Sequence, residues 1–294
     1  MSIRRPIILG IAKGYGVADL SPFILSLKNS GYTGDICLFV DAMPPETLEF
    51  LYSHRVQFQS LPTRYFTQTR RHLIRAAANL LPAKFRKAAQ IELSRYYLHL
   101  IDVRWPCYLD FLQKTRGLYS HVMFTDVKDV IFQRSPFEFE WKSPFCSFYE
   151  PPGFFIGNDG PTYGWLKKAF GETEARKISD QRIICAGVSF AEIDAALEYL
   201  DLMCGHLIRT NDRGLVDQGI HNYLLHHKVL KASSVYDYAD TPVLHLGMMP
   251  PEKLEFNAEG LLVNGSGEVV RAIHQYFAHR KAMARCLDLI TAPA

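Results

Sequence analysis

The chain has 294 residues, and 48% of them are hydrophobic, which is enough apolar material for a large buried core. This composition excludes a disordered chain, and no apolar run approaches the roughly 20 residues that a membrane-spanning helix needs. The six cysteines are scattered without a Cys-x-x-Cys pair, so we expect buried thiols. The first six residues lead into an apolar stretch without a secretory leader, which predicts a cytoplasmic protein.

The net charge of +3 hides a local concentration of basic residues. Residues 51–91 contain eight Lys or Arg and no Asp or Glu, so the rest of the chain has 25 basic against 30 acidic residues. Within this segment, residues 64–90 could contact anionic lipid and make the protein peripheral on the inner membrane face. A solvated helical face, or an arm that attracts an anionic ligand, explains the pattern as well. We expect no nucleic-acid partner, because no recognisable binding module accompanies the charge.

The first part of the chain alternates between apolar strands and helices. The predicted strands are 6–12, 35–40, 55–61 and 121–125, and the predicted helices are 19–29, 44–52 and 92–100. Strands separated by helices favour an α/β fold with a mostly parallel sheet covered on both faces. Ligands of such sheets bind beyond the carboxyl ends of the strands.

The second part is richer in Pro, Gly and aromatic residues, above all between 143 and 164. Here we expect a strand at 182–185, helices near 193–208 and 218–227, and a hairpin-like stretch over 254–273. No internal repeat or low-complexity linker divides the chain, so a single domain is predicted.

Two carboxylates, Asp126 and Asp129, stand where the apolar strand 121–125 ends. Buried acids cost free energy unless they are paired or bound to a metal, so acids at such a position often belong to a site. Either residue could instead cap a short helix. Spacing alone leaves both interpretations open.

The residues around this pair carry more information. The run from Thr125 to Gln133, Thr-Asp-Val-Lys-Asp-Val-Ile-Phe-Gln, resembles the metal-binding segment of GT-A-type glycosyltransferases, particularly those with an Asp-Val-Arg-Asp-Val-x-Phe-Gln run. The resemblance extends over 10–15, 26–34 and 273–276. It implies one GT-A-like domain, 1–294, with a Rossmann-type, mostly parallel central sheet flanked by helices.

This resemblance also implies an activity. The half 1–133 would bind the nucleotide, and the half 134–294 would bind the sugar and the acceptor. The reaction would be a metal-dependent transfer of sugar from a nucleotide-diphospho-sugar, a UDP- or GDP-sugar, to a hydroxyl of a glycan, a lipid-linked acceptor or a protein.

Three residues would hold the metal. By the resemblance, Asp126 would contact the donor ribose or the metal, and Asp129 would ligate Mn²⁺ or Mg²⁺, hard cations that prefer oxygen ligands. His274 matches the imidazole that related enzymes supply as the remaining protein ligand. Many members have Asp-x-Asp where this chain has Asp-x-x-Asp, so the principal ligand of the two stays open. The usual Asp-Arg after His-Gln-Tyr is replaced here by Phe277 and Ala278.

Further residues resemble parts of a donor-sugar site. Cys185-Ala-Gly187 matches an Asn-Ala-Gly segment that lets backbone approach the sugar, with Cys in place of Asn. Asp217 and Gln218 match an Asp-Gln pair near the sugar, although an ordinary helix start explains them equally well. Asp217 is the candidate catalytic residue, with Glu150 as a second candidate.

Weaker candidates for donor binding lie elsewhere in the first half. Lys13, Tyr15 and Asp41 follow the first two strands, where a base and a ribose would rest. Arg95, on the predicted helix 92–100, could offset diphosphate charge. A surface salt bridge would explain Arg95 almost as well.

A short-chain NAD(P)-dependent dehydrogenase is the first rival. Gly10, Gly14 and Gly16 follow the first strand and could cradle a pyrophosphate, and Tyr163 and Lys167 have the spacing of a catalytic pair. The Asn-Asn-Ala-Gly segment of that family is absent, and hydride transfer has no use for the acidic strand end.

Two other interpretations remain. A serine hydrolase would use Ser189 in a degenerate nucleophile elbow, with Asp217 and either His245 or His274, but no Gly-rich oxyanion segment accompanies it. A non-catalytic GT-A scaffold that binds a nucleotide-sugar would fit the departures from the family pattern.

Overall fold

The computed structural model describes residues 4–62, 68–99, 101–210 and 214–292. Its main sheet has seven strands in the order β3-β2-β1-β4-β7-β6-β8, and a smaller sheet has the order β5-β10-β9. The strands are β1 Arg5–Ala12, β2 Asp35–Val40, β3 Gln57–Ser60, β4 Tyr119–Thr125, β5 Val130–Phe132, β6 Phe145–Phe148, β7 Val188–Glu192, β8 Ser233–Tyr236, β9 Val243–His245 and β10 Ala272–His274.

The main sheet is mostly parallel. β3, β2, β1 and β4 run parallel to one another, and β6 runs parallel to β8. β7 is antiparallel to both of its neighbours, β4 and β6. Strands β1, β2 and β4 are buried on both faces, which is why they read as continuous apolar runs in the sequence.

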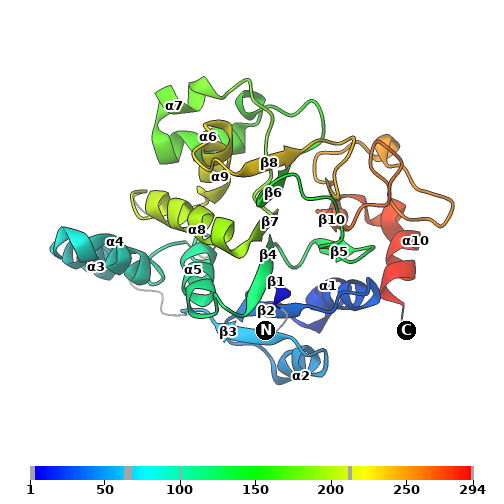
Figure 1. Ribbon diagram of the computed structural model, residues 1–294, viewed down its shortest axis with the longest axis horizontal. Helices are drawn as coiled ribbons and strands as arrows, with labels where there is room; N and C mark the ends of the chain where they lie inside the picture. The colour runs from blue at the N-terminus through cyan, green and yellow to red at the C-terminus, as the bar shows by residue number, and fades with distance from the viewer. Residues whose placement is uncertain (1–3, 63–67, 100, 211–213, 293–294) are drawn as a thin grey trace.

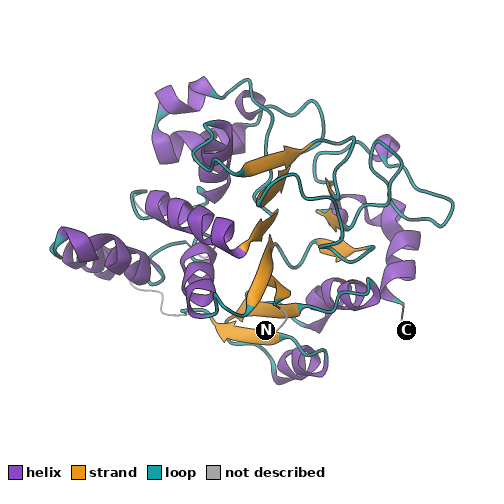
Figure 2. Cartoon of the chain, in the orientation of Figure 1, coloured by secondary structure: helices purple, strands orange, loops and turns teal. Residues whose placement is uncertain are grey.

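Helices cover both faces of the main sheet (Figures 1 and 2). The α-helices are α1 Val17–Asn29, α2 Pro45–Ser53, α3 Gln68–Asn79, α4 Ala83–Ser94, α5 Arg104–Lys114, α6 Gly160–Phe170, α7 Glu172–Lys177, α8 Ile193–Leu207, α9 Asp217–His226 and α10 Arg280–Thr291. Apolar residues of α5, α8 and α9 form the core on one face, and those of α1 with β5 form the core on the other. The predicted α/β fold with a mostly parallel sheet flanked by helices is confirmed.

The smaller sheet brings three distant segments together beside the main one. β10 pairs antiparallel with β5 and parallel with β9, and α10 packs its buried residues Met283, Cys286 and Ile290 in the same apolar cluster as β9 and β10. Since β5 follows β4 after only a short turn, this arrangement places the end of β10 next to the carboxyl end of β4.

The predicted strand at 182–185 is wrong. This segment makes only isolated bridges, and the strand is β7, a few residues later. The physical reason is that side chains take up the backbone of Ile184: its N–H donates to Asn222 Oδ1, and its carbonyl accepts from the amides of Asn222 and Gln218. No ladder partner can then use the same groups.

Two further predictions need correction. The predicted helix 92–100 does not form as such, because α4 ends at Ser94 and turns follow. The hairpin-like stretch 254–273 reduces to two isolated bridges, and Asn264 Oδ1 closes its turn by accepting from the N–H groups of Ser266 and Glu268. The other predicted elements agree with the observed ones to within two residues at each end.

The six cysteines are all buried and free, as the sequence predicted. Within the described residues, no helix combines the length and the apolar character that crossing a bilayer requires.

Candidate functional site

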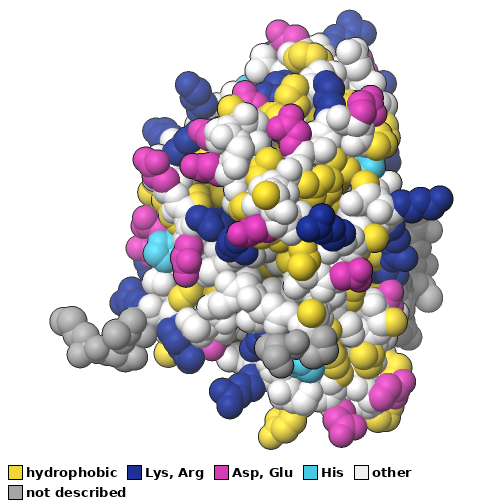
Figure 3. Space-filling model, turned by 90° about the vertical axis from the view of Figure 1, so that its right-hand side faces the viewer, with side chains coloured by type: hydrophobic (Ala, Val, Ile, Leu, Met, Phe, Trp, Pro, Cys, Tyr) yellow, Lys and Arg dark blue, Asp and Glu magenta, His cyan; other side chains and the backbone are white. Residues whose placement is uncertain are grey.

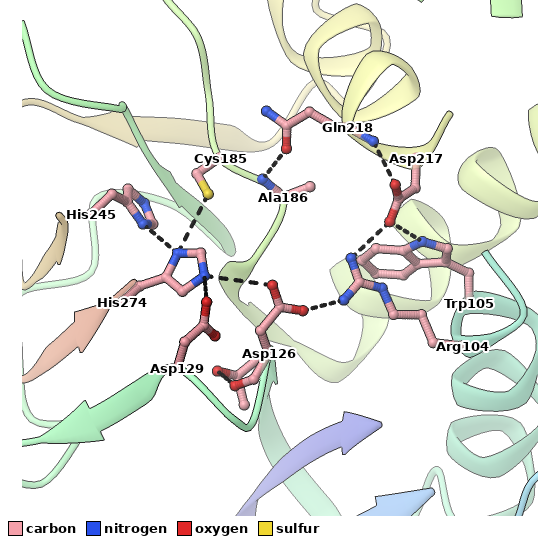
Figure 4. A network of polar contacts seen from close by, with 11 residues as sticks. Arg104, Trp105, Asp126, Asp129, Cys185, Ala186, Asp217, Gln218, His245 and His274 are labelled. Carbon is pink, nitrogen blue, oxygen red and sulfur yellow. Dashed lines mark hydrogen bonds and ion pairs between the residues drawn. The ribbon is translucent and has the colours of Figure 1, made fainter. Parts of the chain in front are cut away.

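Two side chains from the turn between β4 and β5 and one from the end of β10 converge beyond the carboxyl end of β4 (Figure 4). Asp126 directly follows β4, Asp129 directly precedes β5, and His274 ends β10. His274 Nε2 lies 3.5 Å from Asp126 Oδ2 and 3.6 Å from Asp129 Oδ2. All three candidate ligand atoms lie within 4.8 Å of one another. Two carboxylate oxygens and one imidazole nitrogen suit a divalent cation such as Mn²⁺ or Mg²⁺.

The backbone holds this cluster in register. The N–H of Asp126 donates to the carbonyl of Gly187 at 2.8 Å, and the N–H of Gln275 donates to the carbonyl of Asp129 at the same distance. Gln275 adopts a left-handed conformation with φ of 59°, which turns the chain away directly after His274. The three side chains are therefore fixed by strand pairing and by hydrogen bonds from their immediate neighbours.

The cluster balances its own charge. Burial alone would raise the pKa of Asp126, but Arg104 and His274 outweigh it and lower that pKa to about 2. Burial, to which Asp126 adds, raises the pKa of Asp129. Burial opposes protonation of His274, yet the two carboxylates raise its pKa overall. A divalent cation at the same three atoms would compensate the charge of the two carboxylates in the same way.

Arg104 links the cluster to a second carboxylate. From the first position of α5 its Nη1 donates to Asp126 Oδ1 at 2.5 Å and its Nη2 donates to Asp217 Oδ2 at 2.7 Å. Trp105 Nε1 donates to the same oxygen of Asp217 at 3.2 Å, and the N–H of Gln218 donates to the other oxygen at 2.9 Å. This buried arginine holds the two carboxylates at a fixed separation.

Arg104 was not predicted from the sequence, which suggested Arg95 as the cation that could offset diphosphate charge. The structure pairs Arg95 with Glu92 and with Asp110, the second at 3.2 Å, and does not bring it to the cluster. One signal pointed to Arg104: Pro106 marks the first turn of a helix, which places the arginine at the start of that helix, before five uncharged residues, 105–109. A charge on a buried helical face needs a partner.

Gly187 leaves room for the side chains of His274 and Asp126, a role that the sequence did not indicate. A Cβ atom at this position would lie 2.3 Å from His274 Cε1 and 2.9 Å from Asp126 Oδ2. Glycine is therefore required for His274 and Asp126 to approach each other. The predicted close approach of a donor sugar to this backbone stays a prediction.

Gln218 uses its side chain to hold the neighbouring segment. Its Oε1 accepts from the N–H of Ala186 and its Nε2 donates to the carbonyl of Ile184, each at 2.8 Å. It thus fixes the backbone between Ile184 and Gly187 against the start of α9.

A cavity of about 350 Å³ opens at this site. Its lining includes six of the residues that the sequence singled out: Asp126, Cys185, Gly187, Asp217, Gln218 and His274. Glu150, the second catalytic candidate, also lines it, and burial raises the pKa of this carboxyl.

The candidates that follow the first two strands, Lys13, Tyr15 and Asp41, are not among the residues that line this cavity. Asp41 accepts a hydrogen bond from the N–H of Gly14 at 3.1 Å. Burial, followed by the fields of Asp126 and Asp129, raises the pKa of Tyr15, so this hydroxyl lies close enough to sense the acids. Arg95 does not line the cavity either.

His245 supports the side of His274 that faces away from the acids. The two residues are direct neighbours on the parallel strands β9 and β10, and their Nδ1 atoms lie 2.9 Å apart. If His274 Nε2 is to bind a metal through its lone pair, its Nδ1 must hold the proton and donate it to His245. Burial, reinforced by His274, lowers the pKa of His245 well below its usual range, which keeps this acceptor neutral. Cys185 Sγ lies 3.6 Å from the same Nδ1.

The residues required by the rival enzymes do not form sites. Tyr163 and Lys167 both bind Glu172, each at 2.8 Å, and neither lines the cavity. Ser189 lies within β7, is buried and has its Oγ 3.4 Å from Ser147 Oγ, so the nucleophile elbow that a serine hydrolase would require does not form here.

No protein-family model matches the chain, and no curated protein matches it in sequence. Several solved structures match the chain in their fold. The chain is similar to the galactosyltransferase LgtC in complex with donor and acceptor sugar analogues, with a TM-score of 0.48, 11% identity, and coverage of 97% of this chain and 94% of that one.

It is also similar to the glycosyltransferase GlyE of Streptococcus pneumoniae TIGR4, with a TM-score of 0.49 and 11% identity; the match covers 100% of this chain but only 61% of that one. A glucosyl-3-phosphoglycerate synthase from Mycobacterium tuberculosis, solved with Mn²⁺, UDP and glucosyl-3-phosphoglycerate, matches with a TM-score of 0.39, 12% identity, and coverage of 80% and 70%. At such identities and scores, the site has to be interpreted from its own residues.

Proposed function

We propose that this protein is a metal-dependent glycosyltransferase of the GT-A type that takes its sugar from a UDP- or GDP-sugar. The observation that carries the proposal is the convergence of Asp126, Asp129 and His274 within 4.8 Å of one another, with Asp126 and His274 in the lining of a cavity. The position beyond the carboxyl end of a central parallel strand is where ligands of such sheets bind. The resemblance of residues 125–133 to a glycosyltransferase metal segment supports the same reaction class.

Asp126, Asp129 and His274 would hold Mn²⁺ or Mg²⁺, which when bound supplies compensation for the charge on the donor diphosphate. Arg104 orients Asp126 through its short hydrogen bond and leaves the other oxygen of that residue facing His274. Because Arg104 also binds Asp217, it would set the distance between a diphosphate held near Asp126 and a sugar held near Asp217.

Asp217 is our proposed catalytic residue. Three donors fix its orientation at the edge of the cavity, where it could contact a sugar hydroxyl or the attacking acceptor. The acceptor would be a hydroxyl of a glycan, a lipid-linked molecule or a protein. A scaffold that binds the donor without turnover is the alternative, and release of nucleoside diphosphate separates the two.

Thermal unfolding with a panel of nucleotide-sugars, with and without Mn²⁺, tests the proposal. A ligand at 100 times its Kd stabilises the folded state by about 2.7 kcal/mol, which corresponds to a rise in Tm of roughly 5 °C. We expect one UDP- or GDP-sugar to raise Tm only when Mn²⁺ is present, and NAD(P) to leave it unchanged. A rise with NAD(P), or equal rises with and without Mn²⁺, would overturn the proposal.

Two variants sharpen this experiment. Asp129→Asn is nearly isosteric but removes a charged oxygen ligand, so the Mn²⁺-dependent shift should disappear. Asp194→Asn is the matched control. Asp194 is an exposed carboxylate in the first turn of α8, where it is paired with Arg116 and not with any residue of the proposed metal site. It should keep the full shift.

A further inference from the structure

Helices α3 and α4 form a hairpin that projects from the body of the protein beyond α5 and α8 (Figure 1, left). Lys87 binds Asp201 of α8 at 2.6 Å, and Arg75 Nη2 donates to the carbonyl of Ile208 at 3.5 Å, so two points hold the hairpin to the body. The start of α3 and the end of α4 both connect to the body, so their junction, residues 80–82, lies at the outer end.

The outer end of the hairpin exposes large apolar side chains. Leu80 is 87% exposed and Phe85 is 55% exposed, and Leu81 between them is also exposed. Leu73 of α3, seven positions before Leu80, is exposed as well. Large exposed apolar side chains gathered in one segment are typical of an interaction surface.

Basic side chains flank this apolar tip. Lys84 and Arg86 are exposed on either side of Phe85; Lys84 Nζ lies 4.7 Å from the centre of the Phe85 ring, and Arg86 Nε donates to the carbonyl of Leu81 at 3.2 Å. No acidic residue occurs between positions 51 and 91. On the face around α10, by contrast, basic and acidic side chains are interspersed (Figure 3). Residues 63–67 of the basic segment lie outside the described residues.

We propose that this tip, defined by Leu80, Leu81, Lys84, Phe85 and Arg86, docks the protein on an anionic lipid surface. The three apolar side chains would enter the boundary between headgroups and acyl chains, and the two basic groups would bind lipid phosphates. An anionic lipid surface suits this tip because exposed apolar side chains and exposed cations occur together there, with no acidic residue in the same segment. The proposal does not depend on the sugar-transfer reaction.

Co-sedimentation of the full chain with lipid vesicles tests this inference. We expect binding to vesicles of phosphatidylcholine mixed with phosphatidylserine, little binding to phosphatidylcholine alone, and weaker binding as salt is raised. The variant Leu80→Ser/Leu81→Ser/Phe85→Ser and the variant Lys84→Gln/Arg86→Gln should each bind about tenfold more weakly or worse. Because all five side chains are exposed, the Tm of both variants should equal that of the unchanged protein.

The matched control is Leu118→Ser/Arg116→Gln, which removes an exposed apolar and an exposed basic side chain far from the hairpin. This control should bind vesicles like the unchanged protein. Failure of the unchanged protein to sediment with anionic vesicles would overturn the proposal, and so would equal loss of binding in the control. A concentration-dependent dimer in light scattering that the triple Ser variant abolishes would assign the tip to self-association instead.

Discussion

Replacing Gly187 with Ala tests the geometry of the proposed metal site most directly. The added methyl carbon would lie 2.3 Å from His274 Cε1, whereas carbon atoms pack at about 3.5–4.0 Å, so the imidazole would have to move by at least ~1.2 Å. The backbone cannot yield easily, because the Gly187 carbonyl accepts from Asp126. The ring cannot retreat freely either, because His245 lies directly behind it.

The expected effect on metal binding follows from this displacement. Metal ligands must lie within about 0.2 Å of their ideal distances, so a shift of ~1 Å removes His274 from the coordination shell. We expect the affinity for Mn²⁺ in the presence of UDP to fall by at least about tenfold, equivalent to ~1.4 kcal/mol. Overpacking should also lower stability by about 1–3 kcal/mol.

Isothermal titration calorimetry with Mn²⁺ and UDP measures the first quantity, and urea unfolding measures the second. Gly164→Ala, in the middle of α6, is the matched control because a Cβ atom there meets no other group within 4 Å. It should leave metal binding unchanged and raise stability by up to about 1 kcal/mol. If Gly187→Ala binds Mn²⁺ as tightly as the unchanged protein, the three side chains do not form the metal site that we describe.

Three further predictions concern residues around the cluster. His245→Leu should weaken Mn²⁺ binding by about 10–100-fold, because His274 loses the acceptor for its Nδ1 proton. His245→Asn should retain most of the affinity, because Asn Oδ1 can replace Nδ1 as the acceptor. Equal losses in both variants would argue against the tautomer of His274 that carries its proton on Nδ1. Arg104→Gln leaves the buried carboxylate of Asp217 and the partly exposed carboxylate of Asp126 without their cation. Urea unfolding should therefore show a loss of roughly 3 kcal/mol, due mainly to Asp217, that Mn²⁺ partly restores, and a loss indifferent to Mn²⁺ would contradict the charge balance. Asp102 is a buried carboxyl group two residues before the start of α5. Burial, together with the nearby charge of Asp217, raises its pKa to about 8. The folded state therefore keeps a proton that the unfolded state loses above about pH 4, and the stability of the protein falls as pH rises toward 8. Asp102→Asn should therefore melt at a higher temperature than the unchanged protein near pH 8, with the difference shrinking toward pH 4; a constant difference across this range would refute the shift.

The sequence by itself determined the local structure and the fold class. Strands buried on both faces appear in the sequence as continuous apolar runs, without the alternation of apolar and polar residues that half-exposed strands show. Helices between such strands permit few connections other than parallel ones. The acids at the end of β4 were visible because a charge directly after a buried strand is expensive without a partner. The match of His274 to a family pattern indicated that it belongs with Asp126 and Asp129, and the structure brings the three together.

Only the tertiary structure decided which other groups complete the site. Arg104 and Asp217 are 113 positions apart, and no local pattern relates them, so sequence reasoning favoured Arg95, which the fold pairs with its own neighbours. The backbone of Ile184 was predicted to form a strand because its apolar neighbours fit one, but Asn222 from α9 takes its hydrogen bonds. Local periodicity reports the burial of each segment, whereas the identity of a buried polar group's partner depends on which segments the folded chain packs together.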